Sequence, residues 1–134
     1  MKKIKFFTAD GNETMEFGFN NVDIAYKDGY DWAVIYASGR TITLSHTPII
    51  AYDDEITNSR VLLDWGAFWK NEMNEAYADS EKILVVFTSG QVPVMLFHGK
   101  ELKFVKQEFG LTMFNMDEKP IWLYEMNYLI LSRK

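Results

Sequence analysis

The distribution of apolar positions along the chain predicts many short strands and one long helix. From residue 3 to residue 45, apolar and polar side chains alternate in five short runs, which is the pattern of half-buried strands. Turn residues separate these runs, including Asp28-Gly29 and Ser38-Gly39, which suit tight hairpins. We therefore predict an antiparallel meander with strands at 3–8, 14–19, 22–27, 32–37 and 40–45.

Residues 59–79 have a helical period instead. Apolar residues recur there at spacings of three and four, so a helix would place them on one face. These residues are Leu62, Trp65, Trp69, Met73 and Ala76. We expect the two tryptophans to pack this helix on the sheet. Gly66 conflicts with a helix of this length, because an interior glycine costs about 1 kcal/mol relative to alanine. The alternative is a short strand over residues 60–65, with the helix beginning near Gly66.

The second half of the chain returns to strand patterns, at 82–88, 92–97, 111–114 and 121–132. Pro93 lacks an amide hydrogen, which places its strand at a sheet edge or a bulge. For the same reason Pro48 predicts that residues 46–58 form a loop leading to the helix. Residues 100–109 fit either a helix or a strand, and the preceding two-residue turn favours a strand.

These elements predict an α+β fold, with a mostly antiparallel meander sheet and one principal helix at about 59–79 packed on it. The length of 134 residues suits a single domain spanning 1–134. Disulfides and thiolate metal sites are excluded, because the sequence has no cysteine. No apolar run is long enough for a signal peptide or a membrane span, so we expect a cytoplasmic protein.

The net charge of −5 is unevenly distributed. Residues 46–81 contain eight acidic and two basic side chains, a net charge of −6, whereas residues 82–134 carry a net charge of +2. Most of these acidic residues lie in the loop before the helix or on its polar face, and a basic partner would bind there. The candidate partner-binding residues are Asp53, Asp54, Glu55, Asp64, Glu72, Glu75 and Asp79.

The histidines, His46 and His98, do not occur in any recognisable catalytic motif. A metal site could combine both with the acidic residues at 53–55, but the spacing matches no known ligand pattern. We therefore expect a protein that is not an enzyme and holds no metal or cofactor. Lys100, Lys103 and Lys106 form a small basic stripe. Three lysines in an acidic chain are too few to predict nucleic-acid binding.

The predicted function is a small acidic protein-interaction module that binds a basic protein partner through the acidic loop and helix at 53–79. Inhibitor or immunity-type proteins of mobile elements and phage use modules of this kind. An exposed aromatic residue, Tyr52 or Tyr77, would anchor the partner, because charge alone adds little affinity. The alternative is a β-rich protein that binds a small ligand in an aromatic-lined pocket, since aromatic residues make up 16% of the chain.

Overall fold

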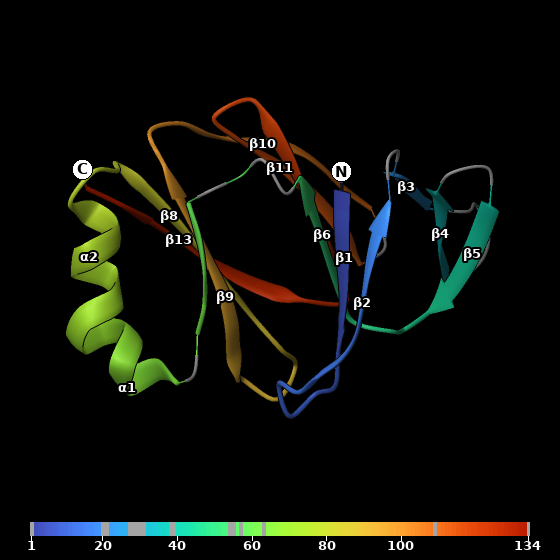
Figure 1. Ribbon diagram of the computed structural model, residues 1–134, viewed down its shortest axis with the longest axis horizontal. Coiled ribbons are helices and arrows are strands. Elements are labelled where there is room, and N and C mark those ends of the chain that lie inside the picture. The colour runs from blue at the N-terminus through green and yellow to red at the C-terminus, as the bar shows by residue number, and fades with distance from the viewer. Residues whose placement is uncertain are drawn as a thin grey trace.

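The chain folds into antiparallel sheets with a single helix on the outside, so the predicted α+β class is confirmed. Figure 1 shows the helix at one end of the molecule, two sheets beside it and a third sheet at the other end. The Asp28-Gly29 and Ser38-Gly39 turns lie outside the described residues. The computed structural model describes residues 2–19, 22–26, 32–37, 40–53, 56, 58–62, 64–108 and 110–133.

The largest sheet has six strands, in the order β10-β11-β12-β6-β1-β2. The predicted loop at 46–58 was wrong in part, because residues 49–53 form β6 near the centre of this sheet. Pro48 lies just before this strand, where its missing amide hydrogen costs no ladder bond and its carbonyl accepts a hydrogen bond from Phe7. The strands are β1 (Lys2–Phe7), β2 (Glu13–Phe19), β6 (Ile49–Asp53), β10 (Leu102–Glu108), β11 (Leu111–Met116) and β12 (Lys119–Tyr124).

A four-stranded sheet, in the order β13-β8-β9-β7, lies between the six-stranded sheet and the helix. In β8, Leu84 and Val86 pack in the core shared with the six-stranded sheet, whereas Ile83 and Val85 pack beneath the helix. Because both faces are covered, this strand is continuously apolar. The strands are β7 (Ser59–Val61), β8 (Lys82–Phe87), β9 (Pro93–Gly99) and β13 (Asn127–Ser132).

The helix is shorter than predicted and covers residues 65–77. It consists of α1 (Trp65–Ala67), a π-helical turn η1 (Phe68–Glu72) and α2 (Met73–Tyr77). The strand alternative for the preceding residues is confirmed by β7. Gly66 lies in the first turn, so the cost of an interior glycine does not arise.

The helix contains a π-helical turn, and its first residue, Phe68, packs against the sheet. Its wider hydrogen-bonded turn runs from the carbonyl of Phe68 to the amide of Met73. Phe68 and Ala76 are fully buried, and they pack with Leu62, which directly follows β7. The predicted packing through Trp69 was wrong, because its side chain is 49% exposed.

Two further predictions of strand arrangement need correction. The first five strands do not form one meander, because β1 and β2 belong to the six-stranded sheet whereas the other three form a separate sheet. The predicted strand at 121–132 is two strands in different sheets, and Glu125 between them has a φ of 54° that turns the chain. The separate sheet consists of β3 (Val22–Tyr26), β4 (Trp32–Ala37) and β5 (Arg40–Ser45).

Two predictions about individual strands are confirmed. The ladder between β8 and β9 shifts register where Phe87 pairs with Pro93, as expected for a proline at a bulge. The ambiguous segment at 100–109 forms β10, as its preceding turn favoured.

Candidate functional site

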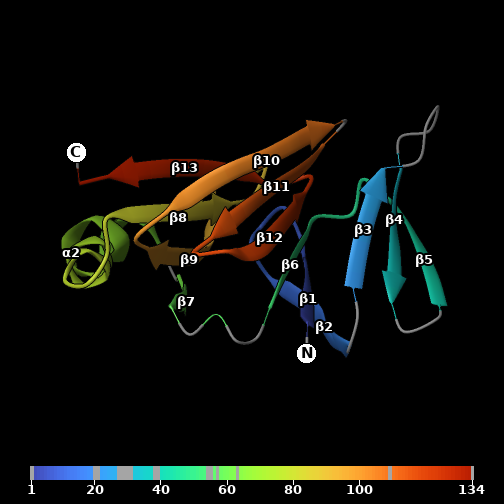
Figure 2. The ribbon, with the colours of Figure 1, turned by 90° about the horizontal axis from the view of Figure 1, so that it is seen from above.

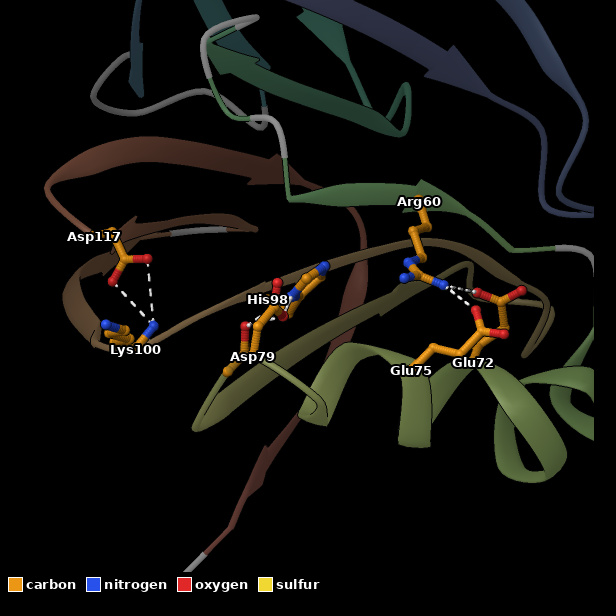
Figure 3. Close-up of polar contacts among 8 residues, drawn as sticks. Arg60, Glu72, Glu75, Asp79, His98, Lys100 and Asp117 are labelled. Atoms are coloured by element: carbon orange, nitrogen blue, oxygen red, sulfur yellow. Dashed lines mark hydrogen bonds and ion pairs between the residues drawn. The ribbon is translucent and has the colours of Figure 1, made fainter.

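The helix carries two of the predicted acidic residues, Glu72 and Glu75, and both contact one cation. The guanidinium of Arg60, in β7, contacts Glu75 and lies 3.3 Å from a carboxylate oxygen of Glu72 (Figure 3). The hydrogen bond with Glu75 is the main cause that raises the pKa of Arg60 above its usual value. Arg60, Glu72 and Glu75 together carry a net charge of −1, so this surface is less acidic than the two glutamates alone would make it.

Asp79 lies just beyond the helix, beside a buried serine and histidine. Ser80 Oγ is 2.7 Å from Nδ1 of His98, and the same nitrogen is 3.5 Å from a carboxylate oxygen of Asp79 (Figure 3). Burial lowers the pKa of His98, although Asp79 opposes this shift. The Asp79 side chain is mostly exposed, so its negative charge is available to a partner.

The other predicted acidic residues do not join this surface as one cluster. Asp64 caps the helix, because its carboxylate accepts a hydrogen bond of 2.7 Å from the Ala67 amide. Asp53 is half-buried at the end of β6, in the six-stranded sheet rather than in a loop. Asp54 and Glu55 lie outside the described residues. The structure thus brings together Glu72 and Glu75, and Asp79 lies just beyond the end of the same helix.

The same helix carries an exposed tryptophan, Trp69. The Trp69 ring stacks on Trp65, with ring centres 6.4 Å apart and planes at 22°. Trp65 is itself held by a 2.7 Å hydrogen bond from its Nε1 to the Gln91 carbonyl and by an edge contact with Phe87. A rigid, half-exposed indole of this kind is a common anchor in protein interfaces.

Sequence reasoning missed Trp69 as a surface residue. The helical period alone placed it with Trp65 in the buried stripe, and the neighbouring Phe68 was not considered as a competitor for that position. A helix beginning after the Asp64 cap makes Phe68 a candidate for the buried face. The predicted anchors are less suitable, because Tyr52 is buried in the core and Tyr77 is half-buried beneath Arg133.

A groove of about 360 Å³ lies between the β1–β2 hairpin and strands β7 and β9. Lys5 lines it, with its ammonium 3.5 Å from Glu16 and 3.7 Å from Glu13. Burial alone would lower the pKa of Lys5, but interactions with Tyr52 and these two glutamates raise it, so the amine stays charged. Among the described residues that line this groove, Phe7 is the only aromatic one. The groove therefore differs from the aromatic-lined pocket of the alternative function, which stays a prediction.

Ser80, His98 and Asp79 do not have the geometry of a catalytic triad. In a triad the serine and the aspartate contact opposite ring nitrogens of the histidine. Here both contact Nδ1, and Ser80 is 2% exposed, which leaves no access for a substrate. This cluster joins the turn after the helix to β9.

Metal and membrane chemistry find no support in the described part of the chain. Its acidic and histidine side chains form no group of three that could hold a metal ion. His46 pairs with Glu125 at 3.4 Å. Glu125 is not one of the acidic residues at 53–55 that the predicted metal site would have combined with His46. Among the helical residues that the structure describes, none belongs to a helix able to cross a membrane.

Comparisons of this chain with protein-family models, with curated proteins and with solved structures find no match. The case for a function therefore depends on the helix surface itself.

Proposed function

We propose that this chain is a protein-interaction module that binds a basic protein partner through the outer surface of its helix. Trp69 is the apolar anchor, and Glu72, Glu75 and Asp79 provide the acidic surroundings. The observation that carries this proposal is the 49% exposure of a tryptophan that is held rigidly by Trp65.

Trp69 has the properties expected of an interface anchor. Tryptophan is enriched among interface residues whose truncation costs 2 kcal/mol or more, roughly 30-fold in affinity. Its stacking on Trp65 restricts the ring before a partner arrives, so binding loses little side-chain entropy.

The charges near Trp69 favour a basic partner. Glu75 remains more than half exposed despite its contact with Arg60, and Asp79 is more exposed still. Acidic side chains around an apolar anchor speed the approach of a cationic surface and disfavour acidic partners. They also disfavour nucleic acid, whose phosphates would be repelled.

A non-catalytic, cytoplasmic inhibitor or immunity-type protein is the class that this surface suits. Such proteins act by occupying the surface of a target, and they need a shaped, charged patch rather than a reactive site. Many targets that bind nucleic acid are basic, and an acidic surface complements them.

The experiment is affinity capture from lysate of the native host, with the protein immobilised as wild type and as Trp69→Ala. A specific partner is captured at low salt, released at high salt and lost with the variant. The captured protein is then identified by mass spectrometry, purified and titrated against both proteins. We expect Trp69→Ala to raise the Kd about 30-fold.

Phe104→Ala is the matched control, because Phe104 is an aromatic residue on β10 that is 57% exposed and lies outside the helix surface. It should leave the Kd unchanged. Equal losses with both variants would contradict the proposal. No protein partner, together with a small molecule retained in native mass spectrometry, would favour the ligand-binding alternative.

A further inference from the structure

The outer edge of β13 is open to pairing in the described part of the chain. This strand forms one border of the four-stranded sheet and pairs with β8 on its inner side (Figure 2). No described residue pairs with its other side. Leu129 and Ile130, at its centre, are 38% and 46% exposed. Because successive side chains point to opposite faces, apolar surface is exposed on both sides of this edge.

The other borders of the two large sheets have features that discourage pairing. β7 is only three residues long. β10 contains lysines and a register shift beside Phe104, and β2 contains Glu13 and Glu16. Short length, charge and bulges are the usual protection of an edge strand. β13 has six residues without a charge or a proline, so this protection is missing.

We propose that β13 pairs antiparallel with β13 of a second copy of this chain, which joins two four-stranded sheets into one of eight strands. The charges at the ends of the strand favour this occupant. Glu125 precedes β13 and Arg133 follows it. Antiparallel pairing brings the acidic end of one copy to the basic end of the other, and it does so twice. Parallel pairing would place like charges together.

The alternation of side chains also selects a register. Leu131 packs beneath the helix, so Leu129 shares that face, whereas Tyr128 packs against the core between the sheets, on the same face as Ile130. A two-fold axis perpendicular to the sheet places the helix-covered faces of the two copies on the same side of the joined sheet. Centred on Leu129, it pairs this residue with its own copy and pairs Tyr128 with Ile130 of the second copy. Every central pair is then apolar.

The first test is sedimentation equilibrium of the full chain from micromolar to submillimolar concentration. We expect a monomer–dimer equilibrium for the wild type. Leu129→Lys places two ammonium groups opposite each other and should raise the dimer dissociation constant by about tenfold or more. Val61→Lys is the matched control, because Val61 is 65% exposed on the other border of the same sheet and should leave the constant unchanged.

The second test is independent of any loss of folding. The chain has no cysteine, so Leu129→Cys introduces a single thiol. Residues opposite each other in an antiparallel pair lie about 4.5–5.5 Å apart, within the range of a disulfide. Oxidation at low protein concentration should give a covalent dimer for Leu129→Cys and much less for Val61→Cys.

A wild type that stays monomeric over the whole range, or equal cross-linking of both cysteine variants, would overturn the proposal. A covalent dimer that forms more readily with Val61→Cys, on β7, than with Leu129→Cys would overturn it as well. Trp69→Ala should leave the dimer intact, because Trp69 belongs to the helix surface. Failure of self-association can therefore be distinguished from failure of the helix to bind a basic partner.

Discussion

Ser80 Oγ lies 2.7 Å from Nδ1 of His98, and both side chains are buried where the chain leaves the helix and enters β8. Ser80 directly follows the turn after the helix, and His98 belongs to β9, so this contact joins the helical layer to the middle of the sheet. Because the imidazole is desolvated there, its charged form is disfavoured.

This contact predicts that stability falls in mild acid. Burial lowers the pKa of His98 below its ordinary 6.5, so the unfolded chain takes up a proton more readily than the native protein. The contribution of His98 is fully present above pH 6.5 and is lost as pH falls toward the native pKa. Urea unfolding at about pH 7.5 and about pH 5 should show this loss, and His98→Gln should show less of it.

His46→Gln provides the control for this pH dependence, because the His46 side chain is mostly exposed. The loss of unfolding free energy between about pH 7.5 and about pH 5 should be larger in His46→Gln than in His98→Gln. The same pH dependence in His98→Gln as in the wild type would contradict the assignment to His98.

The neighbours Phe68 and Trp69 should differ sharply in their effect on stability. Phe68 is fully buried, and Phe68→Ala should cost about 3–5 kcal/mol of unfolding free energy. Trp69→Ala removes a half-exposed ring and should cost about 1.5 kcal/mol or less. Urea denaturation followed by far-UV circular dichroism measures both. Equal costs would contradict the burial of Phe68 and the exposure of Trp69.

Removal of the helix cap should cause a moderate loss. Asp64→Ala deletes the acceptor for the Ala67 amide and should cost about 1 kcal/mol, within a range of roughly 0.5–2 kcal/mol. Asp64→Ser retains a capping oxygen and should recover most of this stability. A loss in the serine variant as large as in the alanine variant would show that the cap contributes little.

Arg60→Ala should strengthen the electrostatic attraction of a basic partner. Arg60 partly neutralises Glu72 and Glu75, and its removal leaves both carboxylates uncompensated. With the partner identified by capture, we expect a faster association rate and a steeper salt dependence in stopped-flow measurements. The unfolding free energy should change by only about 1 kcal/mol or less, because exposed ion pairs contribute little.

Lys103→Ala is the corresponding control, because Lys103 pairs with Glu101 on an exposed part of the chain outside the helix surface. It removes one positive charge without exposing the helix carboxylates. An equal acceleration by both variants would attribute the effect to net charge alone and would contradict a local role of the helix surface.

Local patterns were sufficient to predict the α+β class, most strands and a sheet edge or bulge at Pro93, of which the structure shows the bulge. Each of these depends on residues close together in the sequence, such as alternation along a strand or a proline that lacks an amide hydrogen. The apolar run at 82–88 predicted a strand, which the structure confirms as β8.

The tertiary structure decided the place of β6 and the orientation of the helix. Residues 49–52 have no alternation because both of their faces are buried, and only the pairing of β6 with β1 and β12 shows this. On the helix, Phe68 rather than Trp69 packs in the buried cluster with Val85 and Leu96. The periodicity of the sequence does not distinguish these two neighbours.

For the acidic surface, too, the sequence determined one property and the tertiary structure another. The sequence by itself determined that residues 46–81 are strongly acidic. Only the folded chain decided how much of that charge is available, because β7 carries Arg60 to Glu72 and Glu75, and Asp64 is used as a cap. Charge compensation depends on distances between side chains, and those distances are set by the packing of the helix on the sheet.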